Sequence, residues 1–139
     1  MKSQSEDRKP SGVTLIEMTI VILVLLTMMS VGMYFTQGMS EWKRGKDAGE
    51  KLRTVYAAQK SYLADNPTVV LSTLSEAEAA TRILPYMPTP ETSLPTALSE
   101  DGATTLTIKA NVSPPVTVNG NAAYDPSGST SDGLWDVGL

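Results

Sequence analysis

The chain has 139 residues, of which 41% are apolar and 19% charged, a length that suits one small domain. It contains no histidine and no cysteine, which excludes disulfide bonds, thiol chemistry and any mechanism that needs an imidazole. The net charge of −4 is unevenly distributed, because residues 36–65 carry a net +2 and residues 66–139 a net −6. Such an acidic C-terminal region argues against nucleic acid as a partner, since phosphate binding requires clustered lysine and arginine.

Residues 18–35 read MTIVILVLLTMMSVGMYF, a stretch without one charged side chain. As a helix it spans about 27 Å, which is close to the hydrocarbon thickness of a bilayer. A buried core helix in so small a domain would show a polar face, and this stretch has none. A cleavable secretory signal is another alternative, but its apolar stretch is shorter and is followed by small residues at the cleavage site. We therefore expect a membrane-spanning helix.

The prolines predict how far this helix continues. None occurs between residues 11 and 66, and Asp65-Asn66-Pro67 is a typical stop signal, so one helix over about residues 14–64 is expected. In its second part, residues 39–66, apolar side chains recur at helical spacing among charged ones, at Met39, Trp42, Leu52, Val55, Tyr56 and Tyr62. This part is expected to be amphipathic and to pack on the C-terminal region.

Three residues in this second part carry more specific expectations. Trp42 follows the apolar stretch at the place where an interfacial aromatic anchor would lie. Gly45 and Gly49 are four residues apart, a spacing that suits either the close approach of another helix or a strand packed directly above them.

The sequence of residues 67–139 predicts a globular head that contains both helix and strands. Ser75 followed by acidic residues indicates a short capped helix, and four prolines between residues 85 and 95 indicate an extended loop. Alternating apolar and polar residues predict short strands joined in part by a hairpin at Asn119-Gly120, over residues 104–108, 116–118, 122–124 and 134–137. The predicted fold class is α+β, with a long N-terminal helix, its first half membrane-spanning, packed on a small antiparallel sheet.

The segment Gly12-Val13-Thr14-Leu15-Ile16-Glu17 places a carboxylate at the start of the apolar stretch, where a charge is costly unless it finds a partner. Together with the short basic leader before it and the apolar residues after it, this segment resembles the prepilin cleavage and methylation motif. That motif belongs to type IV pilins and type II secretion pseudopilins. The resemblance covers roughly residues 8–35, with valine at position 13 where the family usually has phenylalanine.

This resemblance implies a processing pathway. A membrane-embedded prepilin peptidase would cut between Gly12 and Val13 on the cytoplasmic side, and glycine suits the site because it has no Cβ. Val13 would become the N-methylated N-terminus, and Glu17 would pair with that amine on a neighbouring subunit during assembly. The implied domains are a leader (1–12), a transmembrane and filament-core helix (13–38), an amphipathic continuation (39–66) and a periplasmic or extracellular globular head (67–139).

The function that the resemblance implies is that of a structural subunit of a type IV pilus-like filament or a type II secretion pseudopilus. Its implied partners are copies of itself, minor pilins or pseudopilins, the prepilin peptidase and methyltransferase, an inner-membrane assembly platform, and membrane lipid before assembly. The subunit would lie in the bacterial inner membrane, with its head outside the cytoplasm, until it joins a periplasmic or cell-surface filament.

The alternative to this function is a single-span anchor that displays a binding domain outside the cytoplasm. No enzymatic activity is expected, because the chain has neither an imidazole, a thiol nor a glycine-rich phosphate loop.

The C-terminal run from Tyr124 to Asp136 is rich in glycine, serine and aspartate. Such loops offer the carboxylate and carbonyl oxygens that Ca²⁺ prefers, and major pseudopilins carry a calcium site in a comparable loop. The candidate ligands are Asp125, Asp132 and Asp136, and Ca²⁺ is the one cofactor that the sequence suggests. The alternative is a closing loop without metal, in which glycines and Pro126 form turns and Trp135 fills the core.

Overall fold

The computed structural model describes residues 12–138. The described elements are, in chain order, α1 (Leu15–Asp65), the 3-10 helix η1 (Leu71–Thr73), α2 (Glu76–Ile83), the 3-10 helix η2 (Leu84–Tyr86), β1 (Ala97–Leu98), β2 (Thr105–Lys109), β3 (Val116–Asn119) and β4 (Ala122–Ala123). The chain divides between Gln37 and Gly38 into two units, which are described separately below. The α+β class, with a long N-terminal helix and a small antiparallel sheet, is confirmed.

Both ends of α1 are set by local sequence, and the predicted helix over residues 14–64 is confirmed within one residue. Thr14 precedes the first turn, and its Oγ1 accepts a hydrogen bond from the Glu17 backbone N–H at 3.3 Å. At the other end the Asn66 side chain donates to the Tyr62 carbonyl at 3.0 Å, and Pro67 cannot continue the helix.

The sheet is an antiparallel meander in the order β1-β2-β3-β4. Strands β2 and β3 match the predicted strands at 104–108 and 116–118, whereas β1 was not predicted. The predicted hairpin is confirmed, but its turn lies one residue later, because Asn119 pairs with Ala122. Gly120 is thus the first central residue, with a φ of 63°, as a type II′ turn requires.

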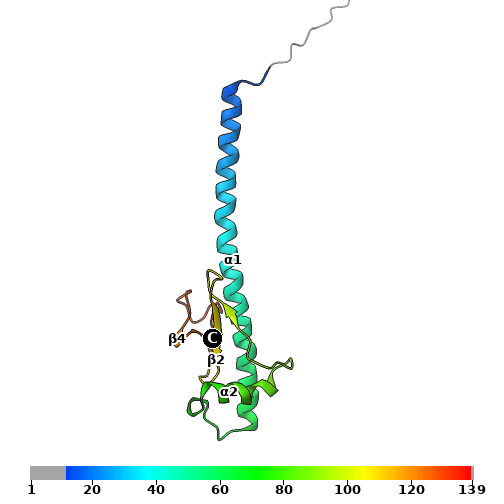
Figure 1. Ribbon diagram of the computed structural model, residues 1–139, viewed down its shortest axis with the longest axis vertical. Helices are drawn as coiled ribbons and strands as arrows, with labels where there is room; N and C mark the ends of the chain where they lie inside the picture. Colours follow the sequence, from blue (N-terminus) through cyan, green and yellow to red (C-terminus); the bar gives the residue numbers. More distant parts are fainter. Residues whose placement is uncertain (1–11, 139) are drawn as a thin grey trace, which may run out of the picture. The chain divides into compact units, whose positions relative to one another are not determined.

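The core of the head lies between the second part of α1 and the sheet, with α2 near the end of α1 (Figure 1). The largest cluster combines buried side chains of α1, η1, α2, β2, the residue after β2 and the C-terminal loop, namely Leu52, Val55, Ala58, Tyr62, Leu71, Ala79, Ile83, Ile108, Ala110 and Val137. A smaller cluster consists of Ala48, Ala97, Leu106 and Trp135. Met39 and Trp42 continue the apolar periodicity of α1 in the sequence but stay exposed and join neither cluster.

The short helix α2 begins as predicted, at Ser75. The Ser75 hydroxyl accepts from the Glu78 backbone N–H, and the Glu78 carboxylate accepts from the Ser75 backbone N–H at 3.1 Å, which together form a capping box. The Ser75 hydroxyl also donates to that carboxylate at 2.8 Å. These hydrogen bonds lower the pKa of Glu78, because they stabilise its charged form.

The prediction of a last strand over residues 134–137 is wrong, because this segment is a loop. Trp135 has a φ of 57°, in the left-handed region, and Gly133 and Gly138 have φ values of 72° and 67°. Backbone in this region cannot continue an extended strand. The alternation of apolar and polar residues over 134–137 therefore belongs to a loop in which the Trp135 side chain is buried.

Candidate functional site

The first candidate site is the start of α1, where the sequence predicts cleavage and assembly. Gly12, Val13 and Thr14 are non-helical and exposed, and α1 begins at Leu15. A Cβ built on Gly12 would meet no atom within 4 Å, so no described residue lies against this position. The predicted scissile bond between Gly12 and Val13 thus lies in accessible, non-helical backbone. Residues 1–11 of the predicted leader lie outside the described residues.

Glu17 lies in the first turn of α1, and it is the one charged side chain between residues 12 and 40. It is exposed, as are the large apolar side chains that follow it up to Phe35. No neighbouring element of the described chain covers this surface, which therefore has to be buried by something outside the described residues if it is to leave water.

The few hydroxyl side chains in this unit do not break its apolar character. Thr19, Thr27 and Ser30 each donate to a backbone carbonyl three or four residues earlier in α1, at 2.7–2.9 Å. Thr36 does the same towards Met33 at 2.9 Å. Polar groups satisfied within their own helix are compatible with a hydrocarbon environment. By length and composition α1 is able to cross a membrane, and its most apolar window is not buried inside the chain.

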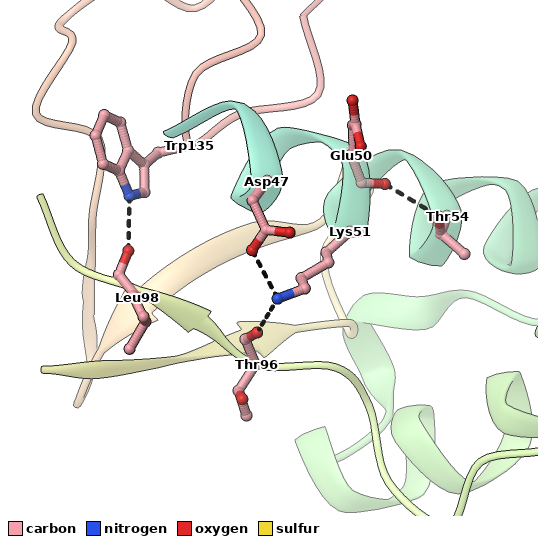
Figure 2. A network of polar contacts seen from close by, with 7 residues as sticks. All are labelled: Asp47, Glu50, Lys51, Thr54, Thr96, Leu98 and Trp135. Carbon is pink, nitrogen blue, oxygen red and sulfur yellow. Dashed lines mark hydrogen bonds and ion pairs between the residues drawn. The ribbon is translucent and has the colours of Figure 1, made fainter. Parts of the chain in front are cut away.

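In the second unit, polar side chains of α1 bind backbone carbonyls of the head. Arg44 donates to the Glu100 carbonyl at 2.6 Å, Lys51 to the Thr96 carbonyl at 3.0 Å, and Arg53 to the Val137 carbonyl at 2.9 Å. Gln59, which is fully buried, donates to both the Ala110 and Val112 carbonyls at 2.7 and 2.9 Å. Figure 2 shows Lys51 between Thr96 and Asp47, with which it also forms an ion pair at 2.7 Å.

Gly45 and Gly49 allow the C-terminal loop to lie directly on α1. A Cβ on Gly45 would come within 2.5 Å of the Trp135 ring, and one on Gly49 would overlap the Gly133 carbonyl oxygen. The Trp135 backbone N–H donates to the Gly45 carbonyl at 3.0 Å, and its indole donates to the Leu98 carbonyl at 3.1 Å (Figure 2). The two glycines therefore make room for a segment of the chain that packs directly on them. This segment is a loop and not the strand that was one of the two expectations.

The second candidate site is the predicted calcium loop. Ser127 Oγ lies 2.7 Å from Asp125 Oδ1 and 3.4 Å from Asp132 Oδ1, so these two aspartates converge on one hydroxyl. Asp136 is different, because both of its carboxyl oxygens are buried and neither has a hydrogen-bonding partner of ordinary geometry. Burial raises the pKa of Asp136, the backbone amide of Gly138 opposes this, and the carboxylates of Asp132 and Asp125 raise it further.

These contacts test how well the loop suits Ca²⁺. The buried, unpaired Asp136 carboxyl is a group that a cation would satisfy. Within residues 12–138, however, no three acidic, histidine or cysteine side chains are grouped closely enough to hold a metal ion. Backbone carbonyls and hydroxyls would have to complete the ligand set, and Ca²⁺ accepts both. Calcium binding remains a prediction, whereas the burial of Trp135 in the core is confirmed.

Sequence reasoning missed the residues that attach the head to the helix. Arg44, Lys51 and Arg53 are among the charged side chains between the apolar positions of the amphipathic part of α1. Nothing in their spacing distinguishes a cation in water from one that binds a carbonyl. Comparison with known proteins adds no relative to this description. No family model, no curated protein and no solved structure matches the chain.

Proposed function

We propose that the chain is a structural subunit of a type IV pilus-like filament or a type II secretion pseudopilus, assembled through its N-terminal helix after removal of the leader. The observation that carries this proposal is the start of α1. Accessible, non-helical backbone at Gly12 and Val13 is followed at once by a capped helix that exposes an unbroken apolar surface with a single carboxylate, Glu17.

The physical roles of these parts follow from their chemistry. The apolar surface of residues 18–35 is suited first to lipid and then to the same surface of other copies, because both environments remove it from water. A carboxylate at the edge of such a helix core is costly when unpaired and tolerable when paired with an ammonium group. Cleavage before Val13 would create that ammonium group, so Glu17 would fix the register between neighbouring subunits.

The head is an independent part of this design. Its core lies within the second unit, in residues 38–138. A filament subunit needs such a division, since its assembly helix must exchange lipid for neighbouring helices without disturbing the fold of the head.

The test is an intact-mass and N-terminal analysis of the protein isolated from its native membranes. A chain that begins at an N-methylated Val13 is the expected result. An intact leader would contradict the proposal and would favour the single-span anchor that displays a binding domain. A Gly12→Val variant provides a control, because a bulky residue before the cleavage site should leave the leader attached while the head folds normally.

A further inference from the structure

A second exposed surface lies just after the apolar part of α1. Met39 lies three and four residues before Trp42 and Lys43, and Lys46 lies four and three residues after them, which places the four residues on one side of the helix. Met39 is 58% exposed and Trp42 49%, and both lysines are exposed as well. Lys46 Nζ lies 5.1 Å from the centroid of the Trp42 ring. These four residues are called the Trp42 patch below.

Among the described residues, no hydrogen bond or ion pair joins the Trp42 patch to the head. The neighbouring cations Arg44, Lys51 and Arg53 all donate to carbonyls of the head, whereas Lys43 makes no hydrogen bond or ion pair within residues 12–138. For Lys46, the cation–π contact with Trp42 is the one polar, ionic or ring interaction within the described part of the chain. The patch therefore presents two unneutralised cations and two large apolar side chains to whatever lies beside it.

We propose that the Trp42 patch binds the headgroups of anionic phospholipids at the membrane surface. Trp42 comes seven residues after Phe35, the last residue of the apolar stretch, so the patch follows directly where the chain would leave the hydrocarbon. Tryptophan prefers the headgroup level of a bilayer, and lysines beside it attract anionic lipid. The apolar Met39 and the Trp42 ring would enter the headgroup layer, while both ammonium groups contact lipid phosphates.

This proposal rests on insertion of the apolar part of α1 into a membrane and not on assembly of a filament. A single-span anchor would need the same lipid contact as a filament subunit before assembly. The fate of the leader and the presence of filaments are therefore independent of it, and a failure of either proposal leaves the other standing.

The chain contains its own control for this proposal. Tyr56 and Lys60 repeat the aromatic–lysine pair on the same helix, with Lys60 Nζ 4.3 Å from the Tyr56 ring centroid. This pair lies fourteen residues further along α1, a rise of about 21 Å in a helix. Electrostatic attraction to a charged surface falls off over roughly 10 Å at ordinary ionic strength. Lys60 should thus be insensitive to the lipid that Lys43 and Lys46 contact.

The experiment measures quenching of Trp42 fluorescence by a phospholipid that carries a nitroxide on its headgroup. The full chain is reconstituted into vesicles of phosphatidylcholine, with or without phosphatidylglycerol. The signal of Trp42 is obtained by subtracting the emission of a Trp42→Phe variant, which retains the buried Trp135. A Lys43→Gln/Lys46→Gln double variant and a Lys60→Gln control are measured in the same way. Thermal unfolding of each variant establishes that its head is folded.

The expected result is stronger quenching of Trp42 when phosphatidylglycerol is present, loss of this increase in the double variant and at high salt, and an unchanged increase in Lys60→Gln. Equal quenching in both kinds of vesicle would overturn the proposal. So would an increase that survives in the double variant or one that disappears equally in the control. If the double variant binds lipid like the wild type but assembles poorly, Lys43 and Lys46 contact a second copy of the chain instead of lipid.

Discussion

The two parts of α1 on either side of Gly38 bury their side chains in opposite ways. Up to Phe35 the leucine, isoleucine, valine and methionine side chains are exposed, whereas Leu52 and Val55 in the later part are fully buried against the head. The same helix thus contains one apolar surface that the head covers and one that no described residue covers. The difference teaches that the later part of α1 is packed within the chain, whereas its N-terminal part leaves its apolar surface open for contacts outside the described residues.

The largest effect, on filament assembly, should come from Glu17, because a change there affects only the exposed N-terminal part of α1. We expect Glu17→Ala to leave the subunit expressed, inserted and folded in its head, while filaments are lost. The physical reason is the loss of the carboxylate that would pair with the processed N-terminus in an apolar core. Electron microscopy detects the filaments, and Glu41→Ala, which removes a carboxylate beyond the apolar stretch, is the matched control. Normal filaments from Glu17→Ala would refute this role.

The second largest effect should come from Gly49. It concerns the stability of the head and of the part of α1 that packs on it. A Cβ at this position would overlap the backbone oxygen of Gly133, which cannot move far while the Trp135 N–H is bonded to Gly45. Overpacking of this kind costs typically about 1–3 kcal/mol of unfolding free energy. We expect Gly49→Ala to lower the melting temperature and shift the Trp135 emission towards that of exposed tryptophan.

Gly38→Ala is the control for this prediction. A Cβ on Gly38 meets no atom within 4 Å, so this change should be neutral or should stabilise the helix by up to about 1 kcal/mol. If Gly49→Ala were as stable as Gly38→Ala, the C-terminal loop would not be packed on α1 as described.

Calcium should have a smaller effect, and it tests whether the head is complete without a cation. A ligand at about one hundred times its dissociation constant stabilises the folded state by about 2.7 kcal/mol. We expect the melting temperature in calcium to exceed that in chelator, and Asp136→Asn to abolish the difference, since Asp136 supplies the buried unpaired carboxyl. Identical melting curves in calcium and in chelator would mean that the loop closes without metal.

The smallest effect concerns the cap of α2 and its dependence on pH. Because the folded pKa of Glu78 is lowered, its contribution to stability is present above its ordinary value of 4.5 and is lost as the pH falls through the folded value. Loss of the serine cap typically costs about 1 kcal/mol. Urea unfolding at neutral and acidic pH should show that Ser75→Ala is less stable at neutral pH and loses less stability on acidification. An unchanged dependence on pH would contradict the role of the capping box.

Part of the fold could be predicted because its determinants are local. The bounds of α1 depend on Thr14 at one end and Asn66-Pro67 at the other, and the start of α2 depends on Ser75. Alternation in the sequence identified β2 and β3. In β2 the buried side chains of Leu106 and Ile108 alternate with less buried ones and join the two core clusters. Strand β1 escaped detection because two residues are too few to show any periodicity.

The remaining features depend on contacts between residues far apart in the sequence. The left-handed conformation of Trp135 is held by Gly45 and Leu98, which no local pattern around residue 135 reveals. Met39 and Trp42 fit the apolar spacing of α1, yet the head does not extend over them, and spacing alone does not determine where a partner ends. At the first candidate site, the accessibility of Gly12 and Val13 depends only on the local backbone before α1. At the second, the carboxyl group of Asp136 becomes buried and unpaired only when the C-terminal loop is folded.

The hydrogen bonds from Arg44, Lys51, Arg53 and Gln59 end on main-chain carbonyls of the head. Every residue type has the same main-chain carbonyl, so these hydrogen bonds do not depend on which side chains the loops expose to solvent. Loops that carry other side chains could therefore bind the same helix residues, provided that their backbone keeps the same conformation. A filament built from such subunits could change the surface it offers to its surroundings without redesigning the part that assembles.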